Sequence, residues 1–348
     1  MSTATPYGPE ISEGLLHCDS DHWFPIVRGV PRMLPDALET HWAALTAASA
    51  GSARALPSSA MPRRDLRARS RRAVERRTRE RFSLEWSYLG ERDRVWGVEL
   101  DDRVRQFFLE PIRIPTEQLE GKTLLDAGCG NGTQSVAYTE HGLEVVALDL
   151  SLGVEFGQGF RQLRPRARPD RVHFVQADLQ SPPLAPASFD IIHSAGVLHH
   201  TPDTKEAFRR IRPLLRPSGS FYVYLYKYER GHTPLLNTIR WATTRIPSRG
   251  SARLAVLLAP AAQAFCSIMT RLGVRRYPHF GRREMAHALM DVFAAPYAHY
   301  HSFAEVAEWY RAEGLADVWL CHEELRGFGA CGRAEAGSAD SAAAGLAP

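Results

Sequence analysis

The chain lacks the features of a secreted or membrane-spanning protein. Its five cysteines have no paired spacing, which argues against a disulfide framework and favours free thiols in a reducing compartment. No basic stretch followed by an apolar run stands near the start, so we expect no secretory signal. The most apolar window, Leu254–Met269, is short for a bilayer. We therefore expect a buried or lid helix there, with membrane association as the alternative. We expect no membrane span and a cytoplasmic location.

The chain also has little excess charge. A formal charge of +4 over 348 residues is small, and much of the excess lies in the arginine-rich run Arg63–Arg81. Composition alone therefore implies no nucleic-acid partner. Helical spacing lets Glu75 and Glu80 pair with neighbouring arginines, so we interpret the run as a solvated helix face. An RNA-binding arm is the alternative, although no aromatic residues for base stacking are interleaved before Phe82.

The chain is organised around the glycine-rich run Asp126-Ala-Gly-Cys-Gly-Asn-Gly132. Its apolar lead-in predicts a short buried strand, and the glycines allow a tight turn that a ligand can approach closely. A strand, a glycine turn and a helix together form the usual opening of a nucleotide-binding βαβ unit. The run differs from the dinucleotide pattern G-x-G-x-x-G because Asp126 would repel a phosphate but not an ammonium group. This difference disfavours a nicotinamide-dependent oxidoreductase.

From Thr123 onwards the pattern alternates between strands and helices, which is typical of an open parallel sheet with helices on both faces. The predicted strands are 123–126, 144–149, 172–176, 189–194, 220–225 and 316–321. The predicted helices are 133–140, 153–163, 204–215 and 303–313. A proline-punctuated segment from Tyr228 to Pro296 interrupts this rhythm after the fifth strand. Insertions there lie above the carboxyl ends of the strands, so we expect a helical lid over the substrate.

The run from Asp126 to Gly132 resembles motif I of the class I S-adenosylmethionine-dependent methyltransferases, and the resemblance extends roughly over Phe82–Leu320. It implies an α/β fold with a Rossmann-like, seven-stranded, mostly parallel sheet and S-adenosyl-L-methionine as the cofactor. It also implies that Asp149 holds the ribose and that Asp178 accepts a hydrogen bond from the adenine amine. The cofactor-binding residues expected from this resemblance are Asp126, Gly128, Gly130, Gly132, Asp149, Leu150, Asp178, Leu179, Ser194 and Trp86.

The fourth predicted strand leads into Ser194-Ala-Gly-Val-Leu-His-His200, which in this family faces the methyl donor. Enzymes that methylate nucleobase amines usually carry an Asn or Asp-Pro-Pro-aromatic run here, and its absence argues against base methylation. His199 or His200 is a candidate general base because imidazole titrates near neutrality. Alternatively, His199 packs against the cofactor while His200 caps the next helix or faces solvent. Further candidates for substrate contact are Tyr224, Tyr226, Lys227, His299, Tyr300 and His301.

The N-terminal residues predict two short β runs, Gly14–Cys18 and Trp23–Leu34, that are too small to bury a core of their own. They resemble the zinc-ribbon-like leader of some bacterial methyltransferases. The second cysteine of that leader is missing, and Asp21-His22 stands in its place. Structural zinc sites normally gather four ligands dominated by Cys and His, so we predict a small β module without metal, docked on the main domain.

These observations predict five regions along the chain. They are a β module at 1–42, a linker and basic helix at 43–81, a helical cap at 82–120, a methyltransferase domain at 121–328 with its lid at 228–298, and a disordered tail at 329–348. In the cap, Trp86 and Tyr88 either close over the cofactor or serve as packing between domains. The Ala-, Gly- and Ser-rich composition after Ala334 underlies the predicted tail.

The sequence therefore predicts a methyltransferase that modifies an oxygen or nitrogen atom of a small molecule. Biosynthesis of specialised or envelope compounds in a bacterium is the expected setting, with no nucleic-acid partner. An RNA methyltransferase that uses segment 63–81 and a non-catalytic scaffold that retains the fold are the alternatives. The intact set of Asp126, Asp149 and Asp178 disfavours the scaffold. The acceptor, the methylated atom, the choice between the two histidines and the oligomeric state stay open.

Overall fold

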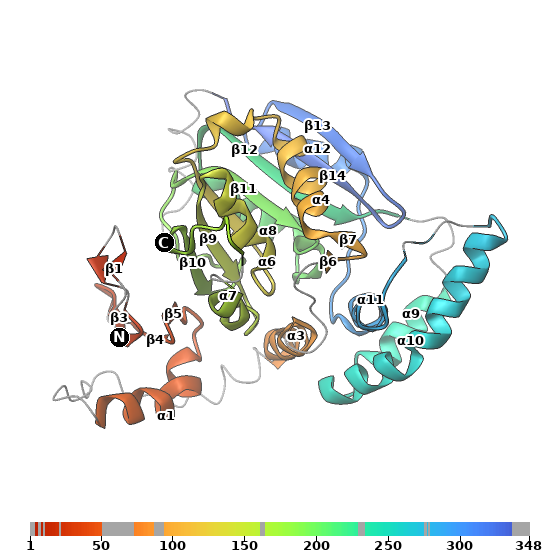
Figure 1. Ribbon diagram of the computed structural model, residues 1–348, viewed down its shortest axis with the longest axis horizontal. Helices are drawn as coiled ribbons and strands as arrows, with labels where there is room; N and C mark the ends of the chain where they lie inside the picture. Colours follow the sequence, from red (N-terminus) through yellow and green to blue (C-terminus); the bar gives the residue numbers. More distant parts are fainter. Residues whose placement is uncertain are drawn as a thin grey trace.

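A seven-stranded sheet forms the centre of the computed structural model, in the order β10-β9-β8-β11-β12-β14-β13 (Figure 1). The structure describes residues 4–5, 8–9, 11–20, 22–50, 73–86, 94–160, 164–228, 234–274, 277 and 279–335. The strands are β8 (Thr123–Ala127), β9 (Glu144–Asp149), β10 (Val172–Gln176), β11 (Phe189–Ala195), β12 (Leu215–Tyr226), β13 (Asp317–Glu323) and β14 (Gly327–Arg333). β8 to β12 pair in parallel, and β14 runs antiparallel to both β12 and β13. The predicted α/β, mostly parallel architecture is confirmed.

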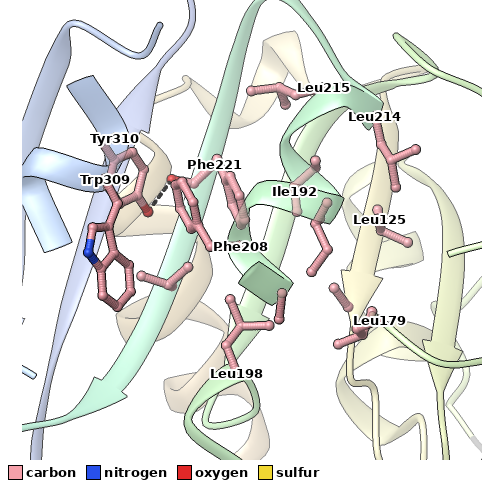
Figure 2. Close-up of a cluster of buried hydrophobic side chains, with 14 of the residues drawn as sticks. Leu125, Leu179, Ile192, Leu198, Phe208, Leu214, Leu215, Phe221, Trp309 and Tyr310 are labelled. Atoms are coloured by element: carbon pink, nitrogen blue, oxygen red, sulfur yellow. Dashed lines mark hydrogen bonds between the residues drawn. The ribbon is translucent and has the colours of Figure 1, made fainter. Parts of the chain in front are cut away.

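Helices cover both faces of this sheet, and apolar side chains fill the space beneath them. The helices are α4 (Leu100–Val104), α5 (Glu110–Ile112), α6 (Thr133–Tyr138), α7 (Val154–Phe160), α8 (Thr204–Ile211) and α12 (Phe303–Ala312). Under α8 and α12, the rings of Phe208 and Phe221 stack with centroids 4.7 Å apart. Tyr310 packs on Phe208 and donates its hydroxyl proton to the Phe221 carbonyl at 3.0 Å (Figure 2). The buried tyrosine hydroxyl thus keeps a hydrogen-bond partner inside an apolar layer.

Two strand predictions need correction. β12 begins at Leu215, five residues before the predicted start at 220, because Leu215 still pairs with Phe189 before the register shifts. The tail predicted from residue 329 overlaps β14, which lies inside the sheet between β12 and β13. Its glycines and alanine fit there because large neighbours fill the space; a Cβ on Gly332 would lie 2.3 Å from the ring of Tyr310. The remainder of that predicted tail, 336–348, lies outside the described residues.

The predicted N-terminal β module is present as the antiparallel strands β3 (Glu13–His17), β4 (Trp23–Val27) and β5 (Val30–Pro31). A two-stranded ribbon of β1 (Ala4–Thr5) and β2 (Gly8–Pro9) precedes it. The module docks on the edge strand β10, where Met33 N donates to the Gln176 carbonyl at 2.8 Å. The fully buried Arg32 pairs with Glu155 at 2.7 Å. The sheet edge is thereby covered.

The resemblance of this module to a zinc-ribbon leader is not supported. Cys18 Sγ lies 3.5 Å from His22 Nδ1. Within the described residues, no cluster of three or more His, Cys, Asp or Glu side chains is arranged to hold a metal ion. A structural zinc site needs about four such ligands, so the residues present do not fit one.

The segment between the module and the main domain is more structured than predicted. α1 (Ala37–Ala50) takes up eight residues of the predicted linker, and α3 (Ala73–Leu84) forms from the basic run, whereas 51–72 lie outside the described residues. The sequence indicated a solvated helix face, but not all arginines of this run are solvated. Arg79 forms two 2.7 Å hydrogen bonds with Asp36, and Arg81 is only 3% exposed.

The lid comprises α9 (Pro234–Thr243), α10 (Ser248–Arg271) and α11 (Arg282–Ala294). The lid lies to one side of the sheet, with α10 along its outer margin (Figure 1). The predicted helix at 254–269 belongs to α10, but most of its side chains are exposed rather than buried. α10 is also long and apolar enough to cross a membrane, so the expected absence of a span is not confirmed.

Between α3 and α4, β6 (Arg94–Val95) and β7 (Val98–Glu99) form a small hairpin.

Candidate active site at the carboxyl edge of the sheet

The glycine turn between β8 and α6 can be built only from glycine. Gly128, Gly130 and Gly132 all have positive φ, between 59° and 90°, where a side chain is strained. A Cβ on Gly128 would lie 2.3 Å from Val197, and one on Gly130 would lie 2.5 Å from the indole of Trp86. The turn therefore presents bare backbone, and side chains from β11's loop and from the residues after α3 lie directly against it.

The three predicted aspartates lie at the carboxyl ends of neighbouring strands, as expected. Asp126 accepts a hydrogen bond from Ser135 Oγ at 2.6 Å. Asp149 accepts from the Gly130 and Ser151 amides at 2.8 and 2.7 Å, and burial raises its pKa. Asp178 accepts from the Gln180 amide at 2.8 Å, and burial raises its pKa as well. The carboxylates thus brace the turn and the following loops.

The remaining predicted cofactor residues fall into two groups, those engaged within the sheet and its core and one, Trp86, that lies against the glycine turn. Ser194 is fully buried, and its hydroxyl donates to the Ala127 carbonyl at 2.8 Å, so it is used within the sheet. The Leu150 carbonyl accepts from Gln176 Nε2 at 3.1 Å, and Leu179 is buried in the core under β8 and β11. Trp86 covers Gly130, as described above. Its predicted partner Tyr88 lies outside the described residues.

His199 and His200 are both buried in the short 3-10 helix η7 (Leu198–His200) after β11. His200 Nδ1 lies 2.8 Å from the Tyr297 carbonyl, and its Nε2 lies 3.0 Å from Asp291 Oδ1. The alternative that His200 caps the next helix or faces solvent is therefore wrong; Asp203 caps α8. His199 stacks on Tyr226 with ring centroids 3.9 Å apart. No described residue forms a hydrogen bond with either of its ring nitrogens.

The surroundings shift the pKa values of the two imidazoles in opposite directions. Burial, with help from the adjacent His200, lowers the pKa of His199 well below its ordinary value. Burial alone would also lower the pKa of His200, but the charge and hydrogen bond of Asp291 outweigh it and raise that pKa. Burial alone would raise the pKa of Asp291, whereas His200 and the Tyr226 hydroxyl lower it. The structure thus holds a neutral His199 beside a buried His200–Asp291 ion pair.

A second buried pair, Glu85 with His287, was missed by sequence reasoning. His287 Nε2 lies 2.7 Å from Glu85 Oε1, and its ring meets the Trp86 indole edge-on at 4.9 Å. Burial opposes a charge on His287, but Glu85 outweighs it and raises the pKa of His287. His287 and Asp291 stand one turn apart on α11, and that i,i+4 spacing on a largely apolar helix was the available signal.

Of the further candidates for substrate contact, Tyr226 joins this cluster through a side-chain hydrogen bond to Asp291. The backbone amides of His299 and His301 also donate to the His199 and Tyr226 carbonyls, both at 2.9 Å. The side chains of the other candidates have the following contacts. They are Tyr224 with Glu324 at 3.0 Å, Lys227 with Glu323 at 2.7 Å, His299 with the Thr201 carbonyl at 3.1 Å, His301 with Glu305 at 3.1 Å, and Tyr300, whose ring lies 6.0 Å from that of Tyr226. The cluster therefore consists of η7, the end of β12, the end of α3 and one face of α11.

Comparison with known proteins identifies the family of the sheet region that carries the glycine turn and the aspartates. Residues 125–223 match the family model described as a methyltransferase domain. The central part of this chain is a methyltransferase domain. The match begins in β8 and ends in β12, so it includes the glycine turn, the aspartates and η7 of the methyltransferase domain. It does not include α3 or the lid, which carry Glu85, His287 and Asp291.

Three curated relatives share this region. The chain is 38% identical to a malonyl-[acyl-carrier protein] O-methyltransferase of Enterobacter lignolyticus, over 28% of this chain and 36% of the relative. It is 34% identical to a demethylmenaquinone methyltransferase of Renibacterium salmoninarum, over 30% and 40%. It is 29% identical to a tRNA U34 carboxymethyltransferase of Idiomarina loihiensis, over 46% and 47%. The similarity thus spans less than half the length of each relative.

S-adenosyl-L-methionine is the cofactor of the methyltransferase domain. The residues of this chain fit such a ligand. A turn without Cβ atoms admits close approach of a ligand to the backbone, and acidic side chains follow the next two strands, where a ribose and an amine need acceptors. Asp126 in front of the turn also suits a ligand that carries an ammonium group.

Proposed function

We propose that this chain transfers a methyl group from S-adenosyl-L-methionine to an oxygen or nitrogen atom of a small-molecule acceptor. The observation that carries the proposal is His199, a buried imidazole with a lowered pKa and no hydrogen-bond partner among the described residues. It stands two residues after Val197, which lies against Gly128 of the glycine turn in the methyltransferase domain. When bound, the cofactor supplies an electrophilic methyl group. The protein then has to align the acceptor, exclude water and receive a proton.

The cofactor would be held by the residues at the carboxyl edge of the sheet. The backbone of Gly128, Gly130 and Gly132 faces its amino acid part, the Asp149 carboxylate accepts from the ribose, and Asp178 accepts from the adenine amine. Asp149 already accepts two backbone amides. A carboxylate has about four acceptor positions, so Asp149 can serve the turn and a ribose together.

His199 is assigned as the proton acceptor and His200 as a positioning residue. Both ring nitrogens of His200 face acceptor oxygens, the Tyr297 carbonyl and the Asp291 carboxylate, so this ring stays doubly protonated. Burial, together with the adjacent cation, lowers the pKa of His199 and so favours its neutral form. A neutral imidazole can take a proton from a hydroxyl or amine as the methyl group arrives. Asp291 then limits the cost of a transient positive charge on His199.

The surroundings of the site favour a small acceptor. Phe82 packs on His200 with ring centroids 5.4 Å apart, and Trp86 lies between the glycine turn and His287. These residues come from α3 and its end, so a segment far from the sheet in sequence closes one side of the site. Such enclosure excludes water and strengthens the electrostatic interactions inside it.

An RNA acceptor is the second candidate, because the tRNA-modifying relative matches a longer stretch of this chain than the other two relatives described. The described part of the basic segment argues against it. Arg79 is bound to Asp36, and Arg81 donates to backbone carbonyls of the lid, at 2.8 Å to Thr244 and 2.7 Å to Ile246. Arg79 thus links α3 to the residue before α1, and Arg81 holds the lid, so neither guanidinium is free to pair with a phosphate backbone. The relatives' names span an acyl-carrier protein, a quinone and a tRNA, so the shared domain leaves the acceptor open.

The proposal is tested by incubating the full chain with methyl-labelled S-adenosylmethionine and two fractions of a bacterial extract, one of small molecules and one of total RNA. We expect label in the small-molecule fraction and its loss by about a hundredfold in His199→Gln. Cofactor affinity of His199→Gln, measured by calorimetry, should equal that of the parent chain. Label in RNA would support the second candidate, and cofactor binding without transfer to either fraction would support a non-catalytic scaffold.

A further inference from the structure

The outer lid helix α10 exposes several large apolar residues, and its buried face is made of small ones. Ala252, Ala255 and Ala259 face α11 and form a cluster with Met285 and Met290. On the outer side, the exposed fractions are 75% for Leu257, 55% for Phe265, 51% for Ile268 and 66% for Leu272. These four residues recur three, four or eight positions apart and so form one stripe along the helix. We call the stripe of Leu257, Phe265, Ile268 and Leu272 the outer face of α10.

This distribution is the reverse of what a water-facing lid requires. Burying a large aliphatic or aromatic side chain is the main apolar gain available to a helix, whereas alanine offers little. Contiguous exposed apolar patches mark sites that another surface covers. Within residues 254–270 there is no charged side chain at all, so nothing on this stretch keeps the helix in water.

The charged residues of the segment that contains the outer face are all of one sign. Residues 230–283 contain ten arginines and no Asp, Glu or Lys, although the whole chain has a formal charge of only +4. Arg253 and Arg271 border the uncharged stretch, one at each end, and both are exposed. An apolar stripe with cations at its ends is complementary to a surface with apolar interior and anionic headgroups.

We propose that the outer face of α10 docks on an anionic lipid bilayer, with the helix lying in the interface. A crossing orientation would tear α10 from α11, on which its alanine face packs and which carries His287 and Asp291. An interfacial orientation keeps both contacts. α10 lies at the margin of the molecule away from the sheet, so a planar surface can reach it (Figure 1).

A second copy of this chain is the main competing occupant. A two-fold contact through the outer face would bring two acid-free segments with ten arginines each against one another. Repulsion between the arginines of the two copies opposes association unless anions lie between them. Anionic lipid provides the opposite charge, and for this reason we commit to it. The inference concerns binding alone and holds whether or not the methyl-transfer proposal is right.

Flotation of the full chain with lipid vesicles tests the inference. We expect binding to vesicles of phosphatidylcholine mixed with phosphatidylglycerol, weaker binding to pure phosphatidylcholine, and release from the mixed vesicles by high salt. The double variant Leu257→Glu with Phe265→Glu should weaken partitioning by at least about tenfold. The matched control is Leu320→Glu on the edge strand β13, an exposed leucine outside the lid, which should bind like the parent chain.

Two results would overturn the inference. One is equal binding of the parent chain and the double variant, or no vesicle binding by the parent chain. The other is a dimer of the parent chain in sedimentation without lipid that dissociates in the double variant, which would assign the outer face to a second copy. Circular dichroism of both variants confirms that they are folded, since exposed substitutions change stability little.

Discussion

The carboxyl edge of the sheet and the lid contribute to one site in different ways. At the sheet edge, the predicted site residues stand at the ends of neighbouring parallel strands. The sheet therefore brings these residues close together in space. In the lid, α11 brings His287 and Asp291 to residues that stand at least 90 positions earlier in the chain, on η7 and at the end of α3. Backbone geometry thus forms the part of the site at the sheet edge that is proposed to bind the cofactor, which we call the sheet half. Long-range side-chain pairing forms the part around His199 and His200, which we call the chemical half.

The strongest test of the sheet half is Gly132→Val. A left-handed backbone costs a non-glycine residue about 1–2 kcal/mol, and the new Cβ would lie 2.3 Å from the ring of Phe174. We expect a loss of about 4 kcal/mol in the free energy of unfolding, measured by urea titration. Gly159→Ala is the control, because Gly159 lies in α7 with free space around it. This substitution should stabilise the chain by about 0.5 kcal/mol. Equal effects would contradict the account of the turn.

The strongest test of the chemical half is Asp291→Asn, which leaves the His200 cation buried without its counter-ion. We expect a loss of about 3 kcal/mol in the free energy of unfolding near neutral pH. The pKa of folded Asp291 is below its ordinary 3.8, so its stabilisation is present above that pH and disappears as pH falls further. The pKa of folded His200 is above 6.5, so its stabilisation is present below that pH and disappears as pH rises through the folded pKa.

The loss in Asp291→Asn should therefore be largest between about pH 4 and about pH 6.5 and smaller at about pH 9. Urea titrations of both chains across this range check the prediction. A loss that is independent of pH would show that Asp291 acts through packing and not through its charge.

Cofactor affinity gives a smaller and more specific effect. Asp149→Ala should weaken binding of S-adenosylmethionine by about 30-fold, because a charged acceptor contributes about 2 kcal/mol to its hydrogen bonds. Calorimetry measures the change. Asp190→Ala is the control, since Asp190 lies at the opposite end of the sheet, paired with Arg216 at 2.8 Å. Unchanged affinity in Asp149→Ala would contradict the assignment of this residue.

The smallest effects compare the two faces of α10. Ala259→Leu adds a large residue to the packed face and should cost about 2 kcal/mol, measured by urea titration. Leu257→Ser on the outer face should change stability by less than about 0.5 kcal/mol. A larger loss for Leu257→Ser than for Ala259→Leu would show that the packing of the lid is the reverse of the one described here.

Most of the sheet half was predictable from the sequence because strands and glycine turns are local features. The run from Asp126 to Gly132, Asp149 and Asp178 were all placed correctly at strand ends. Ser194 shows the limit, because alternation along a strand does not reveal that its hydroxyl already binds the Ala127 carbonyl. The interior strand β14 was partly taken for a disordered tail because its small residues suit close packing under Tyr310 as well as they suit a tail.

The chemical half was less predictable because its pairs join residues far apart in the chain. Glu85 with His287 and His200 with Asp291 are separated by 202 and 91 positions, and no periodicity links such partners. Composition also concealed the character of α10. An apolar run of this length suits a buried helix, and only the structure shows that α10 packs through three alanines and leaves large apolar side chains exposed.

The central claim is that the lid sets opposite charge states on two adjacent histidines. NMR of histidine-labelled protein reads these states directly, with His199→Gln and His200→Gln variants used to assign the two signals. We predict that His199 titrates well below the ordinary imidazole pKa of about 6.5 and that His200 titrates above it. Two signals that titrate together near pH 6.5, or a cationic His199 beside a neutral His200, would contradict the account.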